Sequence, residues 1–265
     1  MPASFPPAHR GGSGSPLVCL HGFTDTWRTW ELVLEELEHH HDVLAPTLPG
    51  HAGGPPVEGK LSWSTLLDAL ERMMDDAGFT TAHLAGNSLG GLLALQLAAR
   101  GRADSVVAFA PAGGWAEGDD SYRPLLSMQA EMHQQLRDSA PHAHMLLSTA
   151  EGRRRAAQLI ASSHEHIPAE LLADQLLGAA ICDVAPFLEC ATREGYDLDA
   201  ARILCRVRVV WGTDDRLLPW PSAAVRFREA WLPSADWVVL DGVGHCPQLD
   251  APLEAAQLIV GLTDP

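Results

Sequence analysis

The sequence predicts an α/β protein with a mostly parallel, doubly wound sheet of about seven or eight strands and an inserted helical cap. Two observations predict this fold. Apolar runs of strand length alternate with longer helix-like segments in both ends of the chain, as in parallel sheets covered on both faces. Between them, the segments are helix-like throughout and lack β-branched runs. We therefore expect a core of residues 1–113 and 203–265, and a helical cap of residues 114–202.

The strand and helix signals follow one another in order along the core. Strands are expected at residues 16–20, 43–45, 81–85, 105–110, 207–211 and 237–240. Helices are expected at residues 30–39, 62–77, 89–100, 221–230 and 252–262. In the cap, helices are expected at residues 122–137, 152–163, 168–180 and 184–193. A cap inserted between two strands favours a lid that shapes a pocket over a purely structural subdomain.

The composition limits the possible partners and compartment. The chain has 265 residues, is 46% hydrophobic and carries a formal net charge of −16, which disfavours nucleic acid as a partner. The five cysteines lie in apolar surroundings without a regular framework, so we expect reduced thiols in a cytoplasmic protein. We expect no signal peptide and no membrane span, because no run approaches about 20 apolar residues. The oligomeric state is not predicted.

The pentapeptide Gly-Asn-Ser-Leu-Gly at residues 86–90 lies between a strand-like and a helix-like run. A sharp turn from strand to helix holds its central residue at positive φ, and Gly86 and Gly90 remove the side chains that would collide there. Ser88 would then stand at a helix N-terminus, where a developing anion is favoured. We interpret Ser88 as a nucleophile rather than a simple helix cap, with the backbone N–H of Leu89 facing the same point.

A base and an orienting acid follow two later strands. His245 comes after the strand at residues 237–240 and a loop that contains glycines. Asp215 follows the strand that ends near Trp211, and its carboxylate could hold one tautomer of the His245 ring. Asp214 is the rival acid. Asp215 is preferred because Pro219, four residues later, begins the next expected helix.

The remaining polar groups either support the expected site or have structural roles. The N–H of Phe23, after the first strand, could be a second donor to an oxyanion, whereas His21 is expected to bond its own loop. The histidine pairs near residues 39–41, 142–144 and 164–166 lack the further ligands that a tetrahedral metal site needs. We therefore expect neither a metal nor a cofactor, and we interpret Cys246 as a packing residue.

Together these segments resemble an α/β-hydrolase of the esterase, haloperoxidase and C–C hydrolase branch. The likeness is carried by residues 17–23, 44–51, 86–91, 209–219 and 244–252. It implies a nucleophile at Ser88, an acid at Asp215, a base at His245, and oxyanion donors at the N–H groups of Phe23 and Leu89. Only about sixteen residues precede the first clear strand, so the family's leading hairpin is expected to be shortened.

The departures from the family narrow the expected reaction. Epoxide hydrolases and haloalkane dehalogenases of this fold use an aspartate nucleophile, and Ser88 argues against both. C–C hydrolases usually carry a Gly-Pro-Gly-containing loop and a tryptophan after the histidine, whereas this chain has residues 23–27 and Cys246 there. We expect hydrolysis of a small, neutral, partly apolar carboxylic ester through an acyl-enzyme. The alternatives are C–C hydrolysis of a vinylogous diketone and a non-catalytic binding protein.

Overall fold

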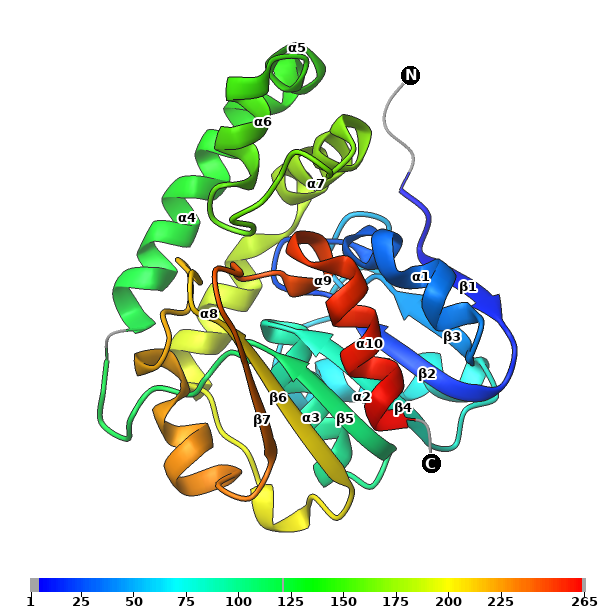
Figure 1. Cartoon of the computed structure of the whole chain (residues 1–265). Helices are drawn as coiled ribbons and strands as arrows, with labels where there is room; N and C mark the ends of the chain where they lie inside the picture. The colour runs from blue at the N-terminus through cyan, green and yellow to red at the C-terminus, as the bar shows by residue number, and fades with distance from the viewer. Residues whose placement is uncertain (1–4, 121, 264–265) are drawn as a thin grey trace.

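A seven-stranded sheet lies at the centre of the molecule, in the order β1-β3-β2-β4-β5-β6-β7 (Figure 1). The computed structural model describes residues 5–120 and 122–263. The strands are β1 (Ala8–Gly12), β2 (Ser15–Leu20), β3 (His41–Pro46), β4 (Ala82–Asn87), β5 (Ala103–Phe109), β6 (Arg206–Gly212) and β7 (Asp236–Leu240). Strand β1 runs antiparallel to β3, and every other pair of neighbours is parallel. The predicted fold class is confirmed.

Strand β1 was not among the strands expected from the sequence. Its residues, Ala-His-Arg-Gly-Gly, form no apolar run, because the strand lies at the sheet edge and is buried only in part. It is held by backbone pairing with β3, from Ala8 opposite Pro46 to Gly12 opposite Asp42. A single antiparallel strand therefore precedes β2, in agreement with the shortened start of the core.

Helices cover both faces of the sheet because successive strand residues point to opposite sides. Val18 and Leu84 pack with the helices α2 (Trp63–Asp76) and α3 (Leu89–Ala99). Leu17 and Val107 pack on the other face with α1 (Glu31–Glu38) and α10 (Pro252–Thr263). A short 3₁₀ helix, η1 (Trp27–Trp30), leads into α1. These two layers form the core on which the loops at the strand ends stand.

One expected core helix, at residues 221–230, is irregular. It consists of a 3₁₀ turn, η4 (Ser222–Ala224), followed by a π-helical turn, η5 (Phe227–Trp231). Between them, the backbone N–H of Arg226 donates to the carbonyl of Gly114 at 2.7 Å, so this donor is lost to the helix itself. The predicted helix is present at residues 222–231, but its turns are irregular where a tertiary contact takes the hydrogen bond of Arg226.

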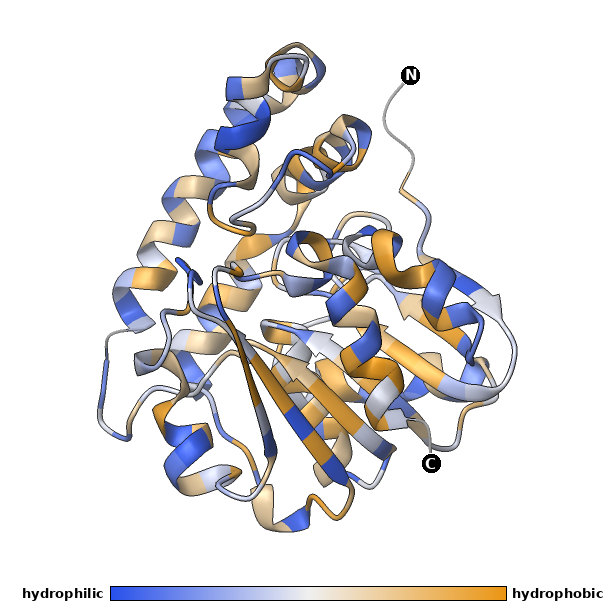
Figure 2. Ribbon diagram, viewed as in Figure 1, coloured by the Kyte–Doolittle hydropathy of each residue, from blue (hydrophilic) through white to orange (hydrophobic). Residues whose placement is uncertain are grey.

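The cap consists of helices between β5 and β6. They are α4 (Tyr122–Ser139), α5 (Ala143–Leu147), α6 (Ala150–Ala157), α7 (Ala169–Ile181) and α8 (Val184–Glu194), with a 3₁₀ turn, η2 (Ala140–His142), after α4. Figure 2 shows apolar strands in the core, whereas the cap helices mix polar and apolar residues. Helix α5 was missed, and α6 ends before the predicted residue 163. The outer limits of the cap stay a prediction.

Remaining short elements connect the cap to the end of the chain. A 3₁₀ turn, η3 (Ala200–Arg202), precedes β6, and a single-turn helix, α9 (Pro247–Asp250), precedes α10.

Within residues 5–120 and 122–263, no helix by itself has the length and apolarity to cross a membrane. Helices α7 and α8 meet that test only as a pair, with a bend of 68° between them.

Helix α3 lies against the sheet at a distance that only glycine permits. A Cβ atom at Gly90 would lie 2.2 Å from the carbonyl oxygen of Leu20 in β2. A Cβ atom at Gly86 would lie 2.2 Å from the carbonyl oxygen of Gly90. The two glycines therefore let β2, β4 and α3 meet at backbone contact.

We expect Gly90→Ala to lower the free energy of unfolding by about 2 kcal/mol or more, because the added methyl group must push two backbones apart. Chemical denaturation measures this change. Gly261→Ala is the matched control, since Gly261 lies near the exposed end of α10, where the nearest atom to a new Cβ is 3.8 Å away. It should be neutral or stabilise by about 0.5–1 kcal/mol. Equal losses in both variants would contradict the argument.

Candidate active site

Ser88 occupies the turn between β4 and α3. Its φ of 54° and ψ of −115° are strained for a residue with a side chain. The backbone is fixed from both sides, since the Ser88 N–H donates to Phe109 at 2.9 Å and the Ser88 carbonyl accepts from Ala112 at 3.0 Å. The Ser88 side chain makes no capping hydrogen bond to α3. The hydroxyl is thus not used as a helix cap and lines a cavity instead.

Asp215 and His245 form a buried pair beyond the ends of β6 and β7. The distance between His245 Nδ1 and Asp215 Oδ2 is 2.7 Å, and each residue exposes 4% of its surface. Asp215 Oδ1 accepts hydrogen bonds from the N–H groups of Leu217 and Leu218 at 2.9 and 2.7 Å. Since a carboxylate can only accept, this pairing favours a proton on Nδ1, and in the neutral ring Nε2 is then an acceptor.

The side chain of the rival acid, Asp214, lies next to the cap. Its side chain is exposed, and Oδ2 is 3.4 Å from the hydroxyl of Ser162 in the cap. Of the two neighbouring aspartates, Asp215 is the one that contacts the histidine.

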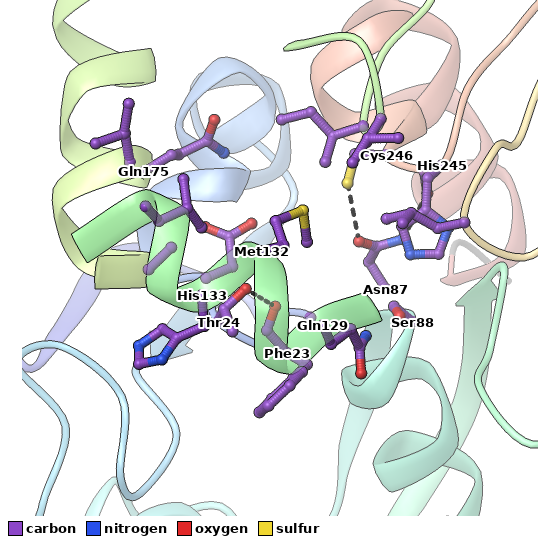
Figure 3. A pocket seen from close by; sticks show the side chains of 18 of the residues that line it. Phe23, Thr24, Asn87, Ser88, Gln129, Met132, His133, Gln175, His245 and Cys246 are labelled. Atoms are coloured by element: carbon purple, nitrogen blue, oxygen red, sulfur yellow. Dashed lines mark hydrogen bonds between the residues drawn. The ribbon is translucent and has the colours of Figure 1, made fainter. Parts of the chain in front are cut away.

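Ser88 and His245 line one cavity of about 170 Å³ beneath the cap (Figure 3). Phe23 lines the same cavity. Ser88 and Phe23 also line a second cavity of about 40 Å³, together with Leu89. The structure therefore brings four of the five residues singled out in the sequence to the walls of these two cavities, with Asp215 behind His245.

The loop that carries Phe23 lies directly against Ser88. A Cβ atom at Gly22 would be 3.4 Å from the Cβ of Ser88. The turn is closed by a hydrogen bond from the N–H of Asp25 to the carbonyl of Gly22 at 3.3 Å, and Thr24 within it has a φ of 64°. The N–H of Phe23 directly follows Gly22, which packs against Ser88.

His21 has the structural surroundings expected from the sequence. Nδ1 lies 2.7 Å from the carbonyl of Gly22, and Nε2 accepts from the N–H of Leu48 at 2.9 Å. Burial lowers the pKa of His21 well below its ordinary value, and the neighbouring His51 adds to this. His21 is therefore neutral and joins the loops that follow β2 and β3.

Asn87 connects the elbow to the histidine loop, a role that the sequence alone did not indicate. Its side-chain Nδ2 donates to the carbonyl of His245 at 2.9 Å and to the carbonyl of Phe109 at 3.2 Å. Its Oδ1 accepts from Cys246 Sγ at 3.3 Å (Figure 3). Asn87 is 1% exposed, so these contacts hold His245 and Ser88 in one rigid frame. The only sequence signal was an asparagine next to a predicted nucleophile.

Asp250 was also missed, and it connects the histidine loop to the cap. Its Oδ2 accepts from the N–H groups of Gly244 and Ser162 at 2.6 and 2.8 Å, and its Oδ1 accepts from the N–H of Ser163 at 2.7 Å. Close by, the N–H of Cys246 donates to the carbonyl of Ile160 at 2.8 Å. The cap is therefore hydrogen-bonded on both sides of His245.

The potential metal ligands on the cavity walls do not gather into a metal site among the described residues. In residues 5–120 and 122–263, no three side chains of His, Cys, Asp or Glu are grouped so that they could bind a metal ion. Cys246 lines the larger cavity, and burial raises the pKa of its thiol well above the ordinary value. It is not a ready nucleophile.

The chain belongs to the alpha/beta hydrolase family, whose sequence profile matches residues 17–258. It is 33% identical to epoxide hydrolase EphH of Mycobacterium tuberculosis over 221 residues, which cover 77% of this chain and 96% of that relative. It is 28% identical to the dihydrolipoyllysine-residue acetyltransferase component of the acetoin cleaving system of Cupriavidus necator, over 92% of this chain and 62% of the relative. A solved thermophilic esterase from Thermogutta terrifontis superposes with a TM-score of 0.71 at 22% identity, covering 96% of this chain and 91% of that one. The family and the fold are thus established.

We expect Asp250→Ala to lower the free energy of unfolding by about 2–4 kcal/mol, because three backbone N–H groups lose their acceptor. Asp250→Asn keeps one oxygen and should lose less. Hydrogen exchange should quicken at Ser162, Ser163 and Gly244 in the alanine variant. Asp120→Ala is the control, since Asp120 forms an exposed ion pair with Arg123 at 3.1 Å, worth at most about 1 kcal/mol. Unchanged exchange at the three amides would contradict the role given to Asp250.

Proposed function

We propose that this protein is a serine hydrolase that cleaves carboxylic esters through an acyl-enzyme. The observation that carries the proposal is the strained, uncapped Ser88 on the wall of a cavity that His245 also lines, with Asp215 bonded behind the ring. Such an arrangement supplies a nucleophile, a base and an orienting carboxylate.

In the proposed reaction, Nε2 of His245 takes the proton of the Ser88 hydroxyl as the oxygen attacks the ester carbonyl. The proton on Nδ1 stays hydrogen-bonded to Asp215, which stabilises the ring when it becomes positively charged. The N–H groups of Phe23 and Leu89 are the proposed donors to the oxyanion, at about 3 kcal/mol each. The alcohol leaves with the proton from His245, and a water molecule activated by the same ring releases the acid.

The two cavities that meet at Ser88 suit a substrate with two parts. The larger is walled by apolar side chains of α4 and α7, such as Met132, Leu136 and Leu176. The smaller is walled by aromatic groups, including Trp63, Trp115 and Tyr196. An ester presents two such parts on either side of its carbonyl carbon, so the acyl group would fill one cavity and the alcohol the other.

The residues at the elbow and beside the histidine also bear on three rival functions. Epoxide opening, the activity in the name of EphH, by way of an ester intermediate would need a carboxylate at the elbow, and this chain has Ser88 there. C–C hydrolysis of a vinylogous diketone would use the same three residues, but the loop at residues 23–27 and Cys246 depart from that branch. A non-catalytic binding protein would not need a strained serine opposite a paired histidine.

A fluorophosphonate probe should label the protein, and Ser88→Ala should abolish labelling and lower kcat/KM for p-nitrophenyl esters by about 10⁵–10⁶-fold. Intact-mass spectrometry and hydrolysis rates measure the two effects. Ser127→Ala, a change at an exposed serine of α4, is the control and should behave as the parent. Persistent labelling of the Ser88 variant would remove Ser88 from the mechanism. Turnover of a vinylogous diketone or an epoxide, but of no ester, would replace the proposed function.

A further inference from the structure

The larger cavity contains one buried amide whose hydrogen-bonding groups are unused. Gln175, in α7, exposes 9% of its surface and lines the cavity. Neither its Nε2 nor its Oε1 has a hydrogen-bond partner within the part of the chain that the structure describes. Figure 3 shows Gln175 on the opposite side of the cavity from Ser88 and His245. A buried amide left in this state is costly, so it marks a position where another group is expected to bind.

The position of Gln175 is set by the contact of α7 with the loop that follows β2. Gly178 permits the close approach, because a Cβ atom there would lie 3.0 Å from Cγ2 of Thr26. An ion pair between Arg28 and Asp174 fastens the same two segments. Since residues three apart share a helix face, Gln175 is turned toward the same loop as Gly178.

Asp25 of that loop also lines the cavity. Its Oδ1 accepts from the N–H of Thr26 at 2.7 Å. Burial raises the pKa of the Asp25 carboxyl to about 6, against the opposing effect of the nearby polar groups of Thr26, Thr29 and Gln175. The amide of Gln175 is thus near enough to stabilise the carboxylate, although its atoms form no direct hydrogen bond of ordinary geometry.

The polar residues at this end of the cavity specify what could bind. A carboxamide offers both a donor and an acceptor, so its best partner offers both as well. An anion is disfavoured, because Asp25 is acidic and none of the described lining residues is lysine or arginine. An aliphatic end would leave the amide unpaired. A neutral hydroxyl or carboxamide offers both a donor and an acceptor, so it matches both groups of the Gln175 amide.

We propose that Gln175 and Asp25 form a polar subsite that selects esters carrying a neutral hydroxyl or carboxamide group remote from the scissile bond. This inference rests on the proposed esterase function and names its substrate class. The part of the ester that enters the larger cavity lies along the apolar walls, and its polar end pairs with the amide of Gln175. Gln175 is a specificity residue here and takes no part in the bond cleavage.

The test compares pairs of esters that differ only at their remote end. One member ends in a primary carboxamide and the other in the isosteric isopropyl group. Acyl chains of several lengths are joined to p-nitrophenol, and a second series carries the same ends on the alcohol of an acetate ester. For the series that enters the larger cavity, the parent enzyme should prefer the carboxamide by about 10- to 100-fold in kcat/KM. Gln175→Met, which keeps the length and apolar volume, should abolish or reverse this preference.

The controls separate a failed subsite from a failed function. Gln135→Met changes an exposed glutamine of α4 that does not line the cavity, and it should keep the preference. Circular dichroism shows whether Gln175→Met is folded, and Asp25→Asn gives a second, independent weakening of the preference. Rapid hydrolysis of both ester types without discrimination in every series would overturn the subsite and leave the esterase proposal standing. Hydrolysis of no ester, with fluorophosphonate labelling also absent, would remove the function on which the subsite rests.

Discussion

The structure depends on one close backbone contact, where the turn from β4 into α3 presses against the end of β2. Gly86 and Gly90 leave no room for a Cβ atom there, so the helix begins directly beneath the loops that follow the neighbouring strands. This contact holds Ser88 in a conformation that a residue with a side chain rarely adopts. The surrounding core offsets this strain through its stabilising contacts. These include the hydrogen bonds of Ser88 to Phe109 and Ala112. Without it, the hydroxyl would be free to turn back onto the helix as an ordinary cap.

Hydrogen bonds from side chains to the backbone hold the loops of the candidate site in place. Asn87 fixes the carbonyl of His245, and Asp250 gathers the N–H groups on either side of the same loop. The carboxylate of Asp215 is fixed in turn by the N–H groups of Leu217 and Leu218. Each group beside the cavity is thus held by hydrogen bonds to its neighbours, which is how a site built on loops stays rigid.

Local signals were sufficient for most of the fold and for the residues at the strand ends. The alternation of apolar strands and helices predicted the parallel sheet, and Ser88, Asp215 and His245 each follow a strand, where side chains of a parallel sheet converge. Strand β1 was missed because an edge strand held by backbone pairing needs no apolar pattern. The irregular turns of the helix at residues 221–230 could not be predicted, because the N–H of Arg226 bonds to a residue more than a hundred positions away. Asn87, Asp250 and Gln175 were missed for the same reason, since their importance lies in partners or in a cavity that only the folded chain brings together.

The hydrogen bonds of Asp250 join the cap and the histidine loop, so that the two segments are expected to move together. Ile160, Ser162 and Ser163 of the cap bond to residues 246 and 250, so these segments cannot separate without breaking three hydrogen bonds. If residues 160–163 of the cap moved outward to admit a substrate, the ring of His245 would be pulled with them. The entrance is therefore expected elsewhere, and an engineered chimera with a foreign lid would have to reproduce this anchor to keep the histidine in place.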